Sequence, residues 1–339
     1  MRMTLHRFEL PLRHTFTIAR ESHSVQPTLI VELEEEGLSG FGEATTNPYY
    51  GATLDSMTDA LEQVRPQLER TSCDNPAALW EQLDPQLSGN RFAQCALDQA
   101  AYDLWGKRQG SPVYKLWGLS VERVPVSNYT IGIDTIDVMV AKLNEFAGWP
   151  IYKIKLGTRH DLEIVRALRQ HTSAVFRVDA NCGWSAEETI ANSRELLGLN
   201  VEFIEQPLPA DRWEEMRRVH AESALPVIAD ESCQMEPDVE NCVGRFHGIN
   251  IKLVKCGGLT PARRMIARAR QLGLKVMVGC MTESSVGISA IAQLLPLLDY
   301  VDMDGAVLLA KDIATGAIVE KGVCHYPTEN GSGVRLLGS

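Results

Sequence analysis

The chain has 339 residues, of which 45% are hydrophobic and 23% are charged, and its formal net charge is −11. This composition is typical of a globular protein with one large domain or two ordinary ones. The acidic balance argues against a nucleic-acid partner, which would require a basic face. The N-terminus lacks the apolar region of a signal peptide, and no later stretch is apolar enough to span a membrane. We therefore expect a cytoplasmic protein without a membrane partner.

The first 118 residues predict an α+β domain. Residues 1–50 contain alternating runs with a turn at Glu36-Gly37, which is typical of an antiparallel meander. Residues 53–118 carry apolar side chains at helical spacing until Gly110-Ser-Pro interrupts the pattern. The G-x-G sequence at 40–42 lacks both a third glycine and a following nucleotide-binding helix, so a dinucleotide-binding fold is rejected.

From residue 119 onwards, strands and helices alternate. Eight runs read as strands, namely VSNYTIG, IYKIKLG, VFRVDAN, VEFIEQPLP, LPVIADES, GINIKLVKCGG, KVMVGCM and YVDMDG. Eight strands with helices between them predict a closed parallel barrel over residues 119–318. The tail, residues 319–339, is rich in turns where an eighth helix would stand, and we expect it to return to the N-terminal domain.

The eight cysteines form no CxxC pair and no zinc-like cluster with histidine. We therefore expect free thiols, as in a reducing cytoplasm. Four of them lie next to predicted strand ends: Cys182, Cys233, Cys256 and Cys280. No histidine is evidently paired with any of these, so they are interpreted as small residues at the barrel mouth and not as nucleophiles.

Charged residues recur along the predicted barrel at intervals of 24 to 26 residues. The series is Lys155, Asp179, Glu205, Asp230 and Lys255, and Asp302 follows after nearly two further intervals. A strand, a helix and two short loops take about this many residues, so the series marks successive βα units. Because the carboxyl ends of barrel strands host the active site, we expect these side chains to meet at one rim.

The three acids of this series, Asp179, Glu205 and Asp230, each end an apolar strand. Crowded carboxylates repel one another, and a hard divalent cation relieves the repulsion. A ligand set of oxygens without cysteine or histidine favours Mg²⁺ over zinc, and we expect one Mg²⁺ per subunit. Solvated acids in separate loops are the alternative, which the position of each acid at a strand end disfavours.

The lysines suggest proton transfer. Lys153 and Lys155 lie two residues apart on one strand, so both should point inward and lower each other's pKa. A lysine with an ordinary pKa of about 10.4 becomes a useful base when the pKa falls to about 7–8. Lys255 lies four strands further round the barrel and is expected to face Lys155. Strand alternation places Lys252 on a different face from Lys255, where a structural role and a supporting role are equally good interpretations.

Two lysines on opposite faces of a substrate carbon permit a 1,1-proton transfer. One lysine removes the proton and the other returns one, while Mg²⁺ holds a carboxylate and stabilises the enediolate that forms. Lysine bases combined with Mg²⁺ are the general pattern of the enolase superfamily.

The motifs together resemble the muconate-lactonising branch of that superfamily. The matching sequences are K-x-K at 153–155, D-A-N at 179–181, E-Q-P at 205–207, D-E-S at 230–232 and K-C-G-G at 255–258. The resemblance covers essentially the whole chain. It implies an α/β fold, namely a (β/α)7β modified TIM barrel with an N-terminal α+β capping domain. It also implies catalytic roles for Lys155, Lys255 and Lys153, and supporting roles beside the metal for Asn181, Glu231 and Lys252.

Within that branch, the dipeptide epimerases carry a D-x-D motif at the eighth strand, which Asp302 and Asp304 match. In that family the pair binds the substrate's α-ammonium group, and two carboxylates on one face suit a cation. Thr130 matches the family's threonine on the first barrel strand and is expected to bond the substrate backbone. The resemblance therefore implies an isomerase that epimerises the C-terminal residue of a dipeptide. L-Ala-D/L-Glu is the leading substrate, which points to reuse of murein peptides.

Several alternatives stay open. Arg20 and His23 in the first cap loop are candidates for pairing a glutamate side chain, whereas Glu21 would cancel their charge or favour a cationic side chain. Hydrophobic and cationic dipeptides therefore remain alternative substrates, and Glu283 has no assigned role. Another reaction of the branch, such as that of an o-succinylbenzoate synthase or a cycloisomerase, conflicts with the Asp302–Asp304 pair, because those substrates lack an ammonium group. A non-enzymatic scaffold has no support, and a homo-oligomer stays open because the family often forms oligomers.

Overall fold

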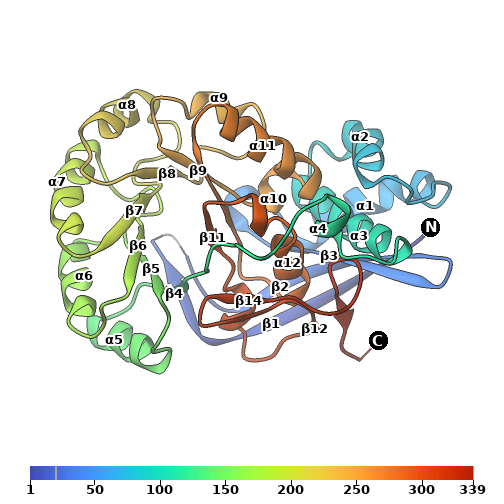
Figure 1. The fold of residues 1–339 in the computed structure, drawn as a ribbon, viewed down its shortest axis with the longest axis horizontal. Coiled ribbons are helices and arrows are strands. Elements are labelled where there is room, and N and C mark those ends of the chain that lie inside the picture. Colours follow the sequence, from blue (N-terminus) through green and yellow to red (C-terminus); the bar gives the residue numbers. More distant parts are fainter. Residues whose placement is uncertain (20, 339) are drawn as a thin grey trace.

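The computed structural model describes residues 1–19 and 21–338, in which an N-terminal α+β region precedes a parallel barrel (Figure 1). Among these residues the barrel sheet has the order β11-β10-β9-β8-β7-β6-β5-β4, and its eight strands are those expected from the sequence. The prediction of an α/β modified TIM barrel with a capping domain is therefore confirmed.

The N-terminal sheet is an antiparallel meander of β1 (Arg2–Ile18), β2 (Glu21–Glu35) and β3 (Leu38–Thr45). Glu36 and Gly37, both with positive φ, form the turn between β2 and β3 that the sequence predicts. The β1–β2 hairpin is long, and near its tip Thr17 O accepts a hydrogen bond from Ile133 N of the barrel at 2.8 Å. The hairpin therefore reaches from the N-terminal region to the first barrel strand, as its blue ribbon shows (Figure 1).

Helices complete this region: η1 (Pro48–Tyr50), α1 (Leu54–Leu68), α2 (Pro76–Leu87), α3 (Arg91–Arg108) and α4 (Val113–Leu116). Helix α3 is buried along most of its length and packs directly on β3. A Cβ at Gly42 of β3 would lie 2.0 Å from Ala96 O, so only glycine permits this approach. Helix α3 also packs directly on α10 (Leu253–Cys256) of the barrel.

The barrel alternates strands and helices in chain order. Its strands are β4 (Tyr129–Ile131), β5 (Ile151–Lys155), β6 (Val175–Asp179), β7 (Val201–Glu205), β8 (Val227–Ala229), β9 (Gly248–Ile251), β10 (Lys275–Gly279) and β11 (Tyr300–Asp302). Its helices are α5 (Ile136–Glu145), α6 (Asp161–Arg169), α7 (Ala186–Leu197), α8 (Trp213–Glu222), α9 (Asp238–Asn241), α10 (Leu253–Cys256), α11 (Leu259–Gln271) and α12 (Ser285–Ala292). The short helices η2 (Leu295–Leu297) and η3 (Gly305–Leu308) flank β11.

Side chains, and not a backbone ladder, join the first and last barrel strands in the described part of the chain. Asn128 Nδ2 donates to Asp302 Oδ1 at 2.8 Å, and Thr130 N donates to Asp304 Oδ2 at 2.5 Å. Met303 N donates to Ser127 Oγ at 3.0 Å. The D-x-D motif therefore also closes the barrel.

The C-terminal segment contains β12 (Ala314–Thr315), β13 (Ile318–Glu320), β14 (Val323–His325) and β15 (Arg335–Leu336). Ser332 N donates to Asp103 Oδ1 of α3, and Val113 N donates to Gly331 O. The segment thus contacts the helices of the N-terminal region. All eight cysteines are free thiols, as expected, and none of the helices described is both long and apolar enough for a membrane span.

Candidate active site

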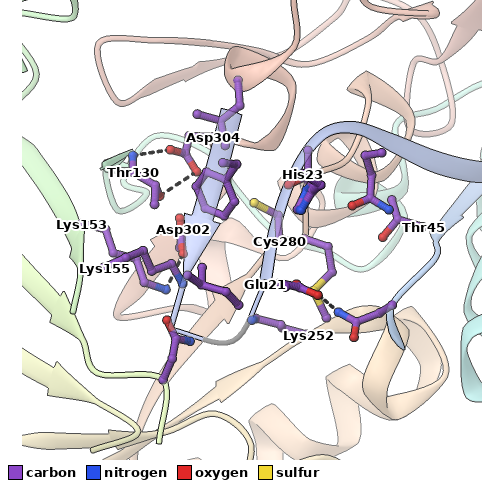
Figure 2. A pocket seen from close by; sticks show the side chains of 18 of the residues that line it. Glu21, His23, Thr45, Thr130, Lys153, Lys155, Lys252, Cys280, Asp302 and Asp304 are labelled. Atoms are coloured by element: carbon purple, nitrogen blue, oxygen red, sulfur yellow. Dashed lines mark hydrogen bonds and ion pairs between the residues drawn. The ribbon is translucent and has the colours of Figure 1, made fainter. Parts of the chain in front are cut away.

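A cavity lies between the carboxyl ends of the barrel strands and the N-terminal region, and it encloses about 720 Å³ including its open mouth. The barrel contributes polar side chains to its wall, namely Thr130, Lys153, Lys155, Asn181, Lys252, Asp302 and Asp304. The cap contributes Phe16, Ile18, Glu21, His23, Thr45 and Tyr50, among others. Figure 2 shows the lysines of β5 and Asp302 on one side and His23 with Thr45 on the other.

Three buried acids gather beside this cavity, in contact with the lysines of its wall. Asp179 ends β6, Glu205 ends β7 in register with it, and Asp230 directly follows β8. One oxygen from each lies within 4.8 Å of the others. Burial and the charge of Asp179 raise the pKa of Glu205 to about 7, although Lys153 opposes the shift. The three carboxylates lie close together even though lysines surround them, and a ligand set made only of carboxylate oxygens fits a hard divalent cation.

The acids are held in place by amides that the sequence reasoning missed. Asn250 Nδ2 donates to Glu205 Oε1 at 2.7 Å, and Gln206 Oε1 accepts from Asp230 N at 2.9 Å. Asn181, which has a φ of +44°, donates its backbone N–H to Asp179 Oδ1 at 3.0 Å. Asn250 stands two residues before Lys252, and this period of two was a signal that both face the barrel interior.

The two lysines of β5 both point inward but have different surroundings. Lys153 Nζ lies 2.8 Å from both Asp302 Oδ2 and Glu205 Oε2, and 3.2 Å from Asp179 Oδ2. Burial lowers the pKa of Lys153, but these carboxylates raise it well above its ordinary value. The expectation of a lowered pKa is therefore wrong for Lys153, because three carboxylates outweigh one ammonium. Lys155 Nζ contacts Asp179 Oδ2 at 2.7 Å.

The other lysine-bearing segment departs from the strand pattern. Strand β9 ends at Ile251, so Lys252 is the N-cap of α10 and Lys255 lies inside that short helix. Lys252 lines the cavity, with Nζ at 2.8 Å from Asp230 Oδ2. Lys255 is not among the residues of the cavity wall. Its Nζ donates to Asp230 Oδ1 at 2.6 Å, to Asp230 O at 2.5 Å and to Cys233 O at 3.0 Å.

Both ammonium groups therefore hold the carboxylate of Asp230 from different sides. Burial alone would raise the pKa of Asp230, but Lys252 and Lys255 lower it well below its ordinary value. Lys252 keeps extended backbone angles and continues the alternation from Asn250, whereas Lys255 lies in the helical turn that follows. The structure brings Lys252, and not Lys255, to the cavity.

Asp302 and Asp304 form the far wall of the cavity with Thr130 (Figure 2). Thr130 Oγ1 donates to Asp304 Oδ1 at 3.2 Å, in addition to its backbone bond. Burial and the neighbouring Asp302 raise the pKa of Asp304 well above its ordinary value. Burial opposes ionisation of Asp302 too, but Lys153 brings its pKa below the ordinary range. Two adjacent carboxyl groups with one dominant cationic neighbour can accept a further cation.

The cap side of the cavity is less charged. Arg20 lies outside the described residues. Glu21 and His23 line the cavity, and His23 Nε2 is buried without a hydrogen-bond partner among the described residues. Burial lowers the pKa of His23, and Glu21 opposes this shift.

Two further acids lie outside the cavity wall. Glu283 Oε1 accepts a hydrogen bond from Met281 N at 2.8 Å, and burial together with Glu43 raises its pKa to about 8. Glu283 therefore supports the wall segment that contains Met281. Glu231 is buried next to Asp230, and its charge contributes to raising the pKa of Lys252.

Family comparisons agree with this geometry. Residues 2–118 match the family "Mandelate racemase / muconate lactonizing enzyme, N-terminal domain", and residues 138–338 match the family "Enolase C-terminal domain-like". The chain belongs to the mandelate racemase/muconate lactonizing enzyme family. The resemblance to the enolase superfamily inferred from the motifs is thereby confirmed.

Relatives within this family cover the whole chain. An L-Ala-D/L-amino acid epimerase of Flavobacterium johnsoniae is 58% identical over 337 residues, covering 99% of this chain and 100% of the relative. An L-Ala-D/L-Glu epimerase of Bacteroides thetaiotaomicron is 42% identical and covers 99% of this chain and 88% of its own. A Cytophaga hutchinsonii dipeptide epimerase, solved with Mg and D-Ala-L-Val, superposes with a TM-score of 0.93 at 27% identity, covering 100% and 97% of the two chains.

Proposed function

We propose that the protein is a Mg²⁺-dependent dipeptide epimerase that inverts the C-terminal residue of its substrate, with L-Ala-D/L-Glu as the leading dipeptide. The observation that carries the proposal is a single cavity lined by two lysines from opposite sides of the barrel and by a D-x-D pair, with a cluster of three acids against those lysines. The names of the relatives, which are L-Ala-D/L-amino acid and L-Ala-D/L-Glu epimerases, support it. Reuse of murein peptides is the corresponding role in the cytoplasm.

In this proposal Asp179, Glu205 and Asp230 hold one Mg²⁺ per subunit. When bound, the ion supplies a Lewis acid that holds the substrate carboxylate and stabilises the negative charge developing when the α-proton leaves. Asn250 and Gln206 fix two of the three acids through the bonds described above. Lys255 fixes Asp230 from behind, which is a role in positioning and not in proton transfer.

The proton transfers are assigned to Lys155 and Lys252. They belong to the second and sixth strand positions of the eight, so they approach from opposite sides of the barrel mouth. One removes the α-proton from one face of the substrate carbon, and the other delivers a proton to the opposite face. We assign the second transfer to Lys252 instead of Lys255, because only Lys252 lines the cavity. Lys153, surrounded by three acids, bridges the carboxylates of Asp302 and Glu205 and reduces their mutual repulsion.

Recognition of the dipeptide is assigned to the far wall. Asp302 and Asp304 would accept hydrogen bonds from the α-ammonium group, and Thr130 would bond the substrate backbone. Arg20 and His23 are the candidates for pairing a glutamate side chain, but Glu21 opposes an acidic side chain by repulsion. Hydrophobic and cationic side chains are therefore the alternatives within this function.

Exchange of the α-proton in D₂O tests the proposal. The protein with Mg²⁺ is incubated with L-Ala-L-Glu and with L-Ala dipeptides that end in hydrophobic or cationic residues, and NMR follows the C-terminal α-proton. We expect deuterium uptake and formation of the D-epimer, loss of both with EDTA, and recovery with added Mg²⁺. N-acetyl-L-Ala-L-Glu is the matched control, since it lacks the ammonium group and should react poorly. Absence of exchange from every dipeptide would falsify the proposed function.

A further inference from the structure

The turn that carries Lys252 is held by the cap domain. Helix α11 begins directly after this turn, and its N-cap is Gly258, which has no side chain to bond the first free N–H groups. The missing acceptor comes from α3. Asp98 Oδ2 accepts from Thr260 N at 2.8 Å, and Asp98 Oδ1 accepts from Thr260 Oγ1 at 2.8 Å. A side chain 162 residues away in sequence therefore caps a barrel helix.

The contact is close enough to determine the path of the backbone. Gly257 and Gly258 have φ angles of +99° and +120°, and a Cβ at Gly258 would lie 2.4 Å from Asp98 Oδ2. The indole Nε1 of Trp80, on α2, also donates to Gly257 O at 2.8 Å. Two cap helices, α2 and α3, therefore form hydrogen bonds to the segment that follows Lys255. These hydrogen bonds restrain the turn from Lys252 to Thr260.

Burial of the Asp98 carboxyl group is energetically unfavourable by itself, because the group loses its hydration. Its side chain is buried away from the cavity wall, and burial raises its pKa to about 7, although the bonds from Thr260 oppose the shift. A buried carboxyl group is unfavourable unless its partners compensate for lost hydration. Here the partners are the N-terminal N–H groups of α11, where the helix dipole also favours a negative charge. The groups that compensate for the burial of Asp98 therefore lie on α11, the helix that directly follows the lysine-bearing turn.

We propose that Asp98 is a positioning residue that sets the reach of Lys252 into the cavity from the cap domain. The inference rests on the proposed function, because it concerns one of the two proton-transferring lysines. Lys155 does not depend on Asp98, since it is the last residue of β5 and pairs in register with Asp179 of β6. Loss of Asp98 should therefore impair one of the two proton transfers more than the other.

Asp103 provides a matched control on the same helix. It is also fully buried, and its carboxylate accepts from Phe41 N at 2.9 Å, Lys107 Nζ at 2.7 Å and Ser332 N at 2.7 Å. None of these partners lies in the cavity wall. Asp103→Asn should lower stability as Asp98→Asn does, without selective effect on either lysine.

The experiment measures α-proton exchange in D₂O from the L-epimer and the D-epimer of the best dipeptide separately. For Asp98→Asn we expect the ratio of the two exchange rates to change by about tenfold, because small misplacement of a reacting group has large effects on rate. For Asp103→Asn the ratio should stay at the wild-type value. Hydrogen–deuterium exchange of the backbone over residues 252–262 gives a readout independent of activity, and it should be faster in Asp98→Asn than in Asp103→Asn.

An equal loss for both epimers, or unchanged backbone exchange over 252–262, would overturn the role of Asp98. If the wild-type protein exchanges no dipeptide, the proposed function fails, whereas backbone exchange still decides whether Asp98 holds the turn. Thr260→Val is the milder second variant should Asp98→Asn not fold. It removes the bond from Oγ1 but keeps the one from the backbone N–H, so it should change the ratio in the same direction and by less.

Discussion

The two lysine-bearing segments of the barrel differ in how their backbone presents the side chains. In β5 both lysines lie on a strand, and the period of two turns Lys153 and Lys155 into the same interior. In the second segment the strand ends before Lys252, and the following helical turn carries Lys255 behind Asp230. Lysines that follow the same spacing of about 25 residues along the βα units therefore take different roles. Lys252, whose backbone is still extended, faces the cavity, whereas Lys255 in the helical turn does not.

Truncation of the two cavity lysines should have the largest effect. Lys155→Ala and Lys252→Ala each remove a group positioned for proton transfer, which contributes typically about 10²–10⁴-fold to rate. We expect the rate of epimerisation to fall by at least about 10³-fold in each variant. Each variant should partly retain α-proton exchange from one epimer, and the retained epimer should differ between the two variants. NMR in D₂O measures both quantities. A Lys252→Ala enzyme with near wild-type rate would contradict the assignment of this lysine.

Lys255 should behave differently from its neighbour. Lys255→Met leaves the buried carboxylate of Asp230 without its closest cation, and breaking a buried ion pair costs about 3–5 kcal/mol. We expect the free energy of unfolding to fall by roughly this amount, together with weaker Mg²⁺ binding, as measured by chemical denaturation and by calorimetric titration. Lys252→Met should lose less stability, because its side chain is more exposed to the cavity. The reverse order would show that the two roles are exchanged.

Removal of charge from the D-x-D pair should have an intermediate effect. Asp302→Asn keeps the shape of the side chain but weakens its attraction for an ammonium group, and a hydrogen bond to a charged group contributes about 1.5–3 kcal/mol. This corresponds to a loss of about 10- to 100-fold in kcat/KM for dipeptides. The activity on N-acetyl-L-Ala-L-Glu should change much less. If the rate on dipeptides stays intact, the pair does not bind the ammonium group.

The smallest effect concerns the opposite end of the barrel. His247 precedes β9, and its Nδ1 accepts a hydrogen bond from Val227 N at 3.1 Å, which requires an unprotonated nitrogen. Burial, and then the nearby His220, lower the pKa of His247 from 6.5 to about 4. Between these values the unfolded chain binds a proton that the folded chain does not, so stability decreases as pH falls from 6.5 to 4.

His247→Asn should flatten this part of the stability profile, measured by denaturant unfolding between pH 4 and pH 8. Activity at pH 8 should stay at the wild-type level, since His247 precedes β9 at the end of the strand opposite Lys252 and is not part of the cavity wall. An unchanged slope of stability against pH would show that other groups cause the acid sensitivity.

Much of the barrel could be predicted because its signals are local. Apolar runs of a few residues identify the eight strands, and charged residues at the ends of several of these runs identify the rim. The same local logic extends to pairs two residues apart, such as Asn128 with Thr130 and Asn250 with Lys252, which both point inward. A search for residues two positions apart therefore identifies site residues that the series of charged residues alone does not include.

By itself, the sequence determined the fold class, the three acids at the rim and the lysines of β5, because strand periodicity decides which side chains face the barrel interior. Only the tertiary structure decided which lysine of the second segment enters the cavity. That choice depends on where β9 ends and how the next turn runs. The turn is shaped by Asp98 and Trp80 of the cap, whose contacts join residues more than 150 positions apart. Contacts over such separations leave no periodic signal in the chain.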